Sequence, residues 1–224
     1  MAIFILLVVV MLALYLLNAK LLKETQRLAS DEELDKVTES LPDNEEICTE
    51  IQKDLGSKCK IELDDKAKSS AYIFFLNKII LSNTESSKKN YSRVLFIAHE
   101  CVHSVQDRLT HQMNFGLANI KNLYDIILLV LLLLRKGSLE LIMISFLISF
   151  VSFYYRMILE ADAVYRSVMV SRKYLKKRDL EYIADKYEEI VPKTIQSMYF
   201  SYIMPILARQ SAFVFLLLVG RVFS

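Results

Sequence analysis

The residues best suited to chemistry in this chain are two histidines and a glutamate in the pentad His99-Glu100-Cys101-Val102-His103. On an α-helix, side chains four positions apart lie on the same face, so His99 and His103 can reach one Zn²⁺ together. Glu100 lies one position further round the helix, where we expect it to act as the general base of peptide hydrolysis. The alternative is an amphipathic helix that carries the motif by chance. The apolar residues 94–98 predict a buried helix, and this setting favours the metal site.

A catalytic zinc normally has three protein ligands and one open position. If the helix continued to His111, that side chain would lie more than about 10 Å further along the axis, so a surface or interfacial position is the better interpretation. Glu160 is the stronger candidate, because it and Asp162 lie among apolar residues, where an inward carboxylate needs a partner. The alternative is ion pairing on the helix surface, since one arginine stands four positions before Glu160 and another four after Asp162.

The composition favours long helices and a membrane protein. Of 224 residues, 54% are apolar, only four are glycine and three are proline, and the mean hydropathy is +0.30. The net charge of +2 and the lack of a basic stripe argue against a nucleic-acid partner. The isolated glycines exclude a glycine-rich phosphate loop.

Four apolar segments predict about four transmembrane helices. Residues 2–17 read as an uncleaved N-terminal anchor, because the positive charges follow the apolar run instead of preceding it. Residues 123–134 and 139–155 are separated by only four residues and predict a tight helical hairpin. The last segment, from 199 to 223, is interrupted by Pro205, Arg209 and Gln210, and its sequence leaves open whether it crosses the membrane.

Between the anchor and the hairpin the chain is mainly polar. We expect helices at residues 31–40 and 44–55, the second ending at Gly56, and a strand at 59–63. Residues 71–82 read as two short strands around Asn77-Lys78, and Ser92 is the expected N-cap of the histidine-bearing helix.

The sequence thus predicts a mainly α integral membrane protein with a small β element and a zincin-like catalytic domain. The expected parts are an anchor (1–18), a zincin-like segment with the HExxH helix (19–122), a transmembrane hairpin (123–155), a helical segment with the third-ligand motif (156–198) and a C-terminal membrane segment (199–224).

The distribution of lysine and arginine predicts a multi-pass protein of the cell membrane with its site facing the cytoplasm. Eight basic residues near the ends of the spans fall on the side of the HExxH helix, and Arg135 and Lys136 fall on the other. In the reducing cytoplasm, Cys48, Cys59 and Cys101 are expected to be free thiols. The opposite orientation would make Cys48 and Cys59 a plausible disulfide pair.

The segments AHECVHSVQD and EADAVYRS, with the apolar hairpin between them, resemble the YugP-like family of membrane zinc metallopeptidases. That family has an AHExGHAxQ-type helix and a later EFDAxRRA-type segment. The layout is also similar to HtpX-type and CAAX prenyl proteases, which space the later motif as ExxAD, whereas this chain has EAD. The chain departs from the family pattern at Val102, Ser104 and Tyr165, where glycine, alanine and arginine are usual.

The resemblance implies a site of three zinc ligands, a catalytic base and two supporting residues. The ligands are His99, His103 and Glu160, the catalytic base is Glu100, and the supporting residues are Asp162 and Arg166.

We therefore expect a membrane-embedded zinc endopeptidase of gluzincin type that cleaves membrane or unfolded proteins at the cytoplasmic face. Its partners would be the lipid bilayer and a peptide or protein substrate. One alternative is a non-catalytic membrane protein with a structural or sensing zinc site. Another is a membrane-anchored interaction module that docks a partner through the charged residues 173–193. The oxyanion donor, Tyr165 or Arg166, and the oligomeric state stay open.

Overall fold

The structure is a computed structural model that describes residues 2–84 and 88–222. It is mainly helical with one small three-stranded sheet, which confirms the coarse fold class that the sequence predicts. The chain divides into two compact units. The first contains Met1–Leu21, Arg108–Ile158 and Gln196–Ser224, and the second contains Leu22–Asp107 and Leu159–Ile195.

Long helices build the first unit. They are α1 (Ala2–Leu28), α6 (Arg108–Leu133), α7 (Leu139–Lys176) and α8 (Tyr182–Val222). Three of them, α1, α7 and α8, have their remaining residues in the second unit. Within the described residues, three helices are long and apolar enough to cross a membrane, namely α6, α7 and α8. The apolar part of α1 as an anchor stays a prediction. The hairpin borders expected at residues 122 and 155 fall inside α6 and α7. Pro205, which interrupts the last apolar segment in the sequence, does not end α8.

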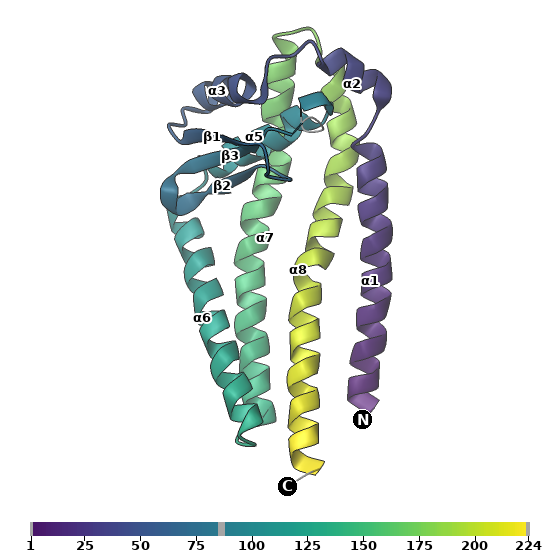
Figure 1. The fold of residues 1–224 in the computed structure, drawn as a ribbon, viewed down its shortest axis with the longest axis vertical. Helices are drawn as coiled ribbons and strands as arrows, with labels where there is room; N and C mark the ends of the chain where they lie inside the picture. The colour runs from purple at the N-terminus through teal and green to yellow at the C-terminus, as the bar shows by residue number, and fades with distance from the viewer. Residues whose placement is uncertain (1, 85–87, 223–224) are drawn as a thin grey trace. The chain divides into compact units, whose positions relative to one another are not determined.

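A tight turn joins α6 to α7, as the short polar spacer predicts, and Figure 1 shows the two helices side by side. Arg135 takes a left-handed conformation (φ 59°), and the Lys136 N–H closes the helix end by donating to the Leu131 carbonyl at 2.8 Å. Gly137 allows the chain to pass, because a Cβ there would collide with the side chain of Leu132.

The second unit contains the sheet and shorter helices. Along the chain they are α2 (Glu32–Thr38), α3 (Asn44–Leu55), β1 (Lys60–Asp64), β2 (Ala71–Ile73), the 3₁₀ turn η1 (Phe74–Leu76), β3 (Lys78–Ser82) and α5 (Arg93–His103). The sheet order is β1-β3-β2, with β1 parallel and β2 antiparallel to β3. β2 is therefore an edge strand.

Most local predictions in this unit are confirmed. α3 ends at Gly56, which takes a left-handed conformation (φ 69°) that glycine adopts at little cost. The strands expected within 71–82 exist, but the 3₁₀ turn shortens the first, and Asn77 (φ 44°) closes that turn. Ser92 is the N-cap residue of α5 without making the expected capping bond, because its hydroxyl binds the Asn90 side chain.

The core of the second unit forms where α3 and α5 meet the sheet. Ile79 and Leu81 alternate along β3 and are fully buried. Val94 and Ala98 of α5 are also fully buried, together with Ile47 of α3. This packing fixes α5, and the opposite face of α5 is left for polar side chains.

Arg93, the first residue of α5, holds the helix start in place. Its guanidinium is buried and donates hydrogen bonds of 2.9 to 3.1 Å to four acceptors of the α2–α3 segment. They are the carbonyls of Thr38, Leu41 and Pro42 and the Asn44 side chain. Hydrogen bonds from a charged donor are stronger than neutral ones, and acceptors left unsatisfied in the interior are costly.

We predict that Arg93→Met destabilises the protein by about 3 kcal/mol, because it removes these bonds and leaves buried acceptors unsatisfied. For a chain of this size the melting temperature should fall by about 6–12 °C. The three buried cysteines allow the measurement by thermal unfolding with a thiol-reactive fluorophore. Arg27→Met, at an exposed position, is the matched control, and an equal effect of both substitutions would contradict the prediction.

Candidate metal centre

Two helices of the second unit supply the candidate ligands. α5 carries His99 and His103 one turn apart, and the part of α7 from Leu159 onward carries Glu160. α7 packs against α5 in this unit, where the Ser171 hydroxyl donates to the Val94 carbonyl at 3.4 Å. The three side chains that the sequence nominates as ligands are thereby brought together.

The donor atoms of this group form a nearly regular triangle. The Nε2 atoms of His99 and His103 are 3.1 Å apart, and Oε2 of Glu160 lies 3.4 and 3.5 Å from them. Tetrahedral ligands at about 2.05 Å from a zinc ion stand about 3.3 Å from one another. The group could therefore hold a metal ion without rearrangement.

The site lies in a largely buried environment. Glu160 is 6% exposed and His103 is 8% exposed. Burial acts to lower the pKa of His103, but its hydrogen bond to Glu160 and the negative charges of Glu160 and Glu100 outweigh this and raise it. A buried carboxylate facing two imidazoles is the environment in which a bound cation would be well compensated.

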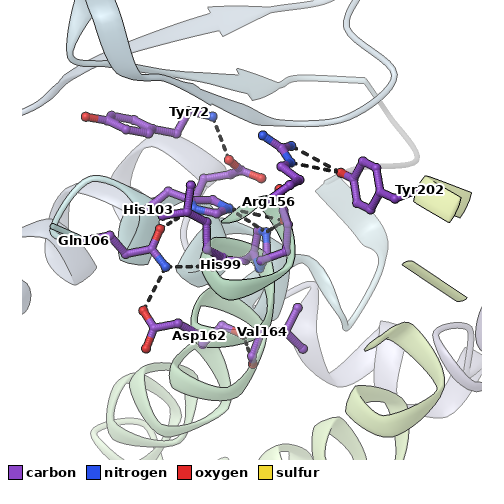
Figure 2. A network of polar contacts seen from close by, with 12 residues as sticks. Tyr72, His99, His103, Gln106, Arg156, Asp162, Val164 and Tyr202 are labelled. Atoms are coloured by element: carbon purple, nitrogen blue, oxygen red, sulfur yellow. Dashed lines mark hydrogen bonds and ion pairs between the residues drawn. The ribbon is translucent and has the colours of Figure 1, made fainter. Parts of the chain in front are cut away.

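Gln106 fixes the orientation of His103 (Figure 2). Its Nε2 donates to the Leu159 carbonyl at 2.7 Å and to Oδ2 of Asp162 at 2.8 Å. The amide oxygen must then face His103, where it lies 2.7 Å from Nδ1. Because this oxygen can only accept, Nδ1 carries a proton, and Nε2 is the nitrogen that a metal ion would bind.

Asp162 and Arg166 take positions outside the donor triangle. Asp162 contacts Gln106 and accepts a hydrogen bond from Arg166 at 3.2 Å, in an ion pair whose side chains are about 42% and 41% exposed. The alternative of ion pairing on the helix surface is thus correct for Asp162, while Glu160 faces the histidines. Tyr165, one of the two expected oxyanion donors, is 61% exposed.

Glu100 lies beside the donor triangle and is held by the sheet. Its Oε2 accepts a 2.6 Å hydrogen bond from the backbone N–H of Tyr72 on the edge strand β2. Burial raises the pKa of the Glu100 carboxyl, although His99, His103 and the Tyr72 N–H act to lower it.

The cysteines pack on the far side of α5. Cys48, Cys59 and Cys101 are free and buried, and the Sγ atoms of Cys48 and Cys101 are 3.4 Å apart. Contact with Cys48 and burial raise the pKa of Cys101 well above its ordinary value, which keeps this thiol protonated. Cys59 instead contacts the Gln52 amide at 2.8 Å.

Sequence reasoning gave no role to Gln106 or to Tyr72. Gln106 occupies the last position of the AHExGHAxQ-type pattern, so the motif contained a signal for it. Tyr72 acts through its backbone, which no residue type reveals. His111 lies on α6, and because α5 ends at His103 it does not continue the ligand face.

Comparisons of the chain with protein-family models, with curated proteins and with solved structures find no match.

We predict about one bound divalent ion per chain, and loss of at least nine-tenths of it in Glu160→Ala and in His103→Ala, because two ligands cannot replace three. Metal content of the purified protein, measured by mass spectrometry, tests this. Glu188→Ala removes an exposed carboxylate and serves as the control. Full metal occupancy in His103→Ala would exclude the proposed ligand set.

Gln106→Leu should weaken metal binding by about 10–100-fold while the protein stays folded, because the orienting contact to His103 is lost. Competition with a chelator of known affinity measures the change. Gln52→Leu is the matched control, since it removes another buried glutamine of the same unit that bonds Cys59. An affinity change no larger than that of the control would show that Gln106 has no orienting role.

Proposed function

We propose that this protein is a membrane-embedded zinc endopeptidase of the HExxH class. The observation that carries the proposal is the triangle of His99, His103 and Glu160 donor atoms with the Glu100 carboxylate beside it. Two imidazoles and one carboxylate, with a position left open, are the ligand set of catalytic rather than structural zinc.

The neighbouring glutamate favours hydrolysis over other chemistry. Two histidines and one carboxylate can also hold Fe(II) in oxygenases, which need no further carboxylate at the reacting centre. Here the Tyr72 N–H directs Glu100 through a 2.6 Å hydrogen bond, which leaves the other carboxylate oxygen to accept a proton. A held carboxylate next to the ion is what a hydrolase requires.

In the proposed reaction, His99, His103 and Glu160 would hold a zinc ion, which would supply the Lewis acidity that polarises the scissile carbonyl and makes water easier to deprotonate. Glu100 accepts a proton from the attacking water as the new C–O bond forms. It then passes this proton to the amine nitrogen as the C–N bond breaks. Gln106 keeps His103 in the tautomer that binds the ion.

A structural or sensing zinc site is the second candidate. Structural sites usually close with four protein ligands, whereas the group in the described part of the chain has three. Cys101, the nearest sulfur in sequence, contacts Cys48 beneath the helix and is poorly placed to be the fourth. The number and placement of these residues favour a catalytic site over a structural or sensing one.

The proposal includes a membrane arrangement. Apart from α6, α7 and α8, we propose that the apolar part of α1 is a fourth span, and that α5 with its sheet is a zincin-like domain. The excess of lysine and arginine on the side of the HExxH helix supports a cytoplasmic site. The likeness of the two motifs to YugP-like peptidases supports membrane or unfolded proteins as substrates.

Glu100→Gln separates metal binding from chemistry. The substitution keeps the size of the side chain and its contact with Tyr72, and Glu100 is not a ligand, so the metal should stay bound. The rate should fall about 10²–10⁴-fold because the general base is lost. Cleavage of fluorescently labelled casein by the detergent-purified protein, with metal content measured in parallel, tests both expectations.

Glu39→Gln is the control for this experiment, since it neutralises an exposed glutamate elsewhere in the unit. Cleavage that persists unchanged in Glu100→Gln would refute the enzyme proposal. Loss of the metal in this variant would make Glu100 a ligand and contradict its role as a base.

A further inference from the structure

A second buried group of charged side chains lies within the first unit, where α6, α7 and α8 meet. Asp125 of α6 is 8% exposed, and its Oδ2 is 3.0 Å from Nε of Arg209 and 3.4 Å from Nζ of Lys121. Its Oδ1 accepts a 2.6 Å hydrogen bond from Ser145, which also binds the Gln210 amide at 2.9 Å. Ionisable residues inside membrane helices are costly and typically mark functional sites.

The position of this group along the helices places it deep in the membrane-spanning part. Lys121 lies about 18 Å along the axis from the end of α6 at Leu133, more than halfway through a hydrocarbon layer of about 30 Å. Apolar side chains around it are exposed, among them Leu123, Ile126 and Leu147 at 61% each. Lipid therefore surrounds the group when these helices span a bilayer.

A cavity of about 280 Å³ lies among the same three helices. One cation from each helix lines it, namely Lys121, Arg156 and Arg209, and its lining includes no carboxylate. Neutral hydrogen-bonding side chains complete the polar wall, among them Asn114, Ser149 and Tyr202. The charged side chains that line the cavity are therefore all cationic, and Asp125 beside it pairs with two of them, Lys121 and Arg209.

Both arginines also donate to neutral groups of the cavity wall. Arg209 donates to Ser149 at 3.3 Å, which directs one end of its guanidinium into the cavity wall. Arg156 donates to the hydroxyl of Tyr202 through Nε and Nη2, at 3.3 and 3.2 Å (Figure 2). Guanidinium groups match the geometry of phosphate oxygens, and lysine adds a point charge.

We propose that this cavity binds the phosphate group of an anionic membrane lipid. The cavity volume of about 280 Å³ leaves room for a phosphate group. Basic pockets between membrane helices recognise anionic headgroups by the same chemistry. This proposal uses the membrane helices alone and is independent of the metal centre.

The test uses the delipidated full-length protein in neutral detergent. Native mass spectrometry would count bound phosphatidylglycerol and phosphatidylcholine with identical acyl chains, and inorganic phosphate would be added in a parallel arm. We expect phosphatidylglycerol to be retained at least tenfold more than phosphatidylcholine, with partial competition by millimolar inorganic phosphate. Binding of inorganic phosphate without phosphatidylglycerol would overturn the lipid proposal, and equal retention of both lipids would do the same.

Variants link the binding to the cavity. Lys121→Gln and Arg156→Gln should each reduce phosphatidylglycerol retention about tenfold or more, since each removes a charged donor. The double variant with Asp125→Asn and Arg209→Gln removes both members of the buried pair, which avoids leaving Asp125 unpaired. Lys136→Gln changes the same charge at the exposed α6–α7 turn and is the control.

Retention that is equally affected by Lys136→Gln would refute the cavity as the site. An unchanged melting temperature of the cavity variants, measured with the thiol-reactive fluorophore, would show that they are folded without reference to the metal, so failure of this proposal is distinguishable from failure of the peptidase proposal.

Discussion

The side-chain amide of Gln106 links the end of α5 to α7. Its hydrogen bonds allow only one placement of the amide nitrogen and oxygen. Its nitrogen faces two acceptors on α7, so its oxygen faces His103 and sets the tautomer of that ring. The same contacts hold α7 at the distance from α5 at which Glu160 meets both histidines. The ligand geometry and the packing of the two helices thus depend on one neutral side chain.

Glu160 and Asp125 are buried carboxylates in different units, and each needs compensation because charges are costly in an apolar interior. Around Glu160 the compensation comes from two imidazoles and, in the proposed function, from a cation. Around Asp125 it comes from Arg209, Lys121 and the Ser145 hydroxyl. The group around Glu160 offers histidine and carboxylate donors, which suit a cation, whereas the cavity beside Asp125 is lined by three cations, which suit an anion.

Two of the positions at which the chain departs from the pattern of the family it resembles lie away from the donor atoms. Val102 is fully buried on the core face of α5, where a larger apolar side chain than glycine packs. Ser104 donates to the Cys101 carbonyl at 2.6 Å, and its hydroxyl lies 2.8 Å from that of Ser57, which ties the end of α5 to the segment after α3. Val102 and Ser104 therefore contribute to how α5 is held and leave the candidate ligands unchanged.

The sequence by itself determined the local features: the shared face of His99 and His103, the end of α3 at Gly56 and the apolar character of α6, α7 and α8. These follow from helical spacing and residue type, which act within one segment. The sequence named Glu160 as the candidate ligand, but only the tertiary structure decided what it and Asp162 contact, because residues two apart point to different sides of a helix and packing against α5 brings Glu160 alone to the histidines. The contact of Glu100 with the Tyr72 backbone was equally invisible, since any residue has the same N–H and only the sheet edge brings it to α5.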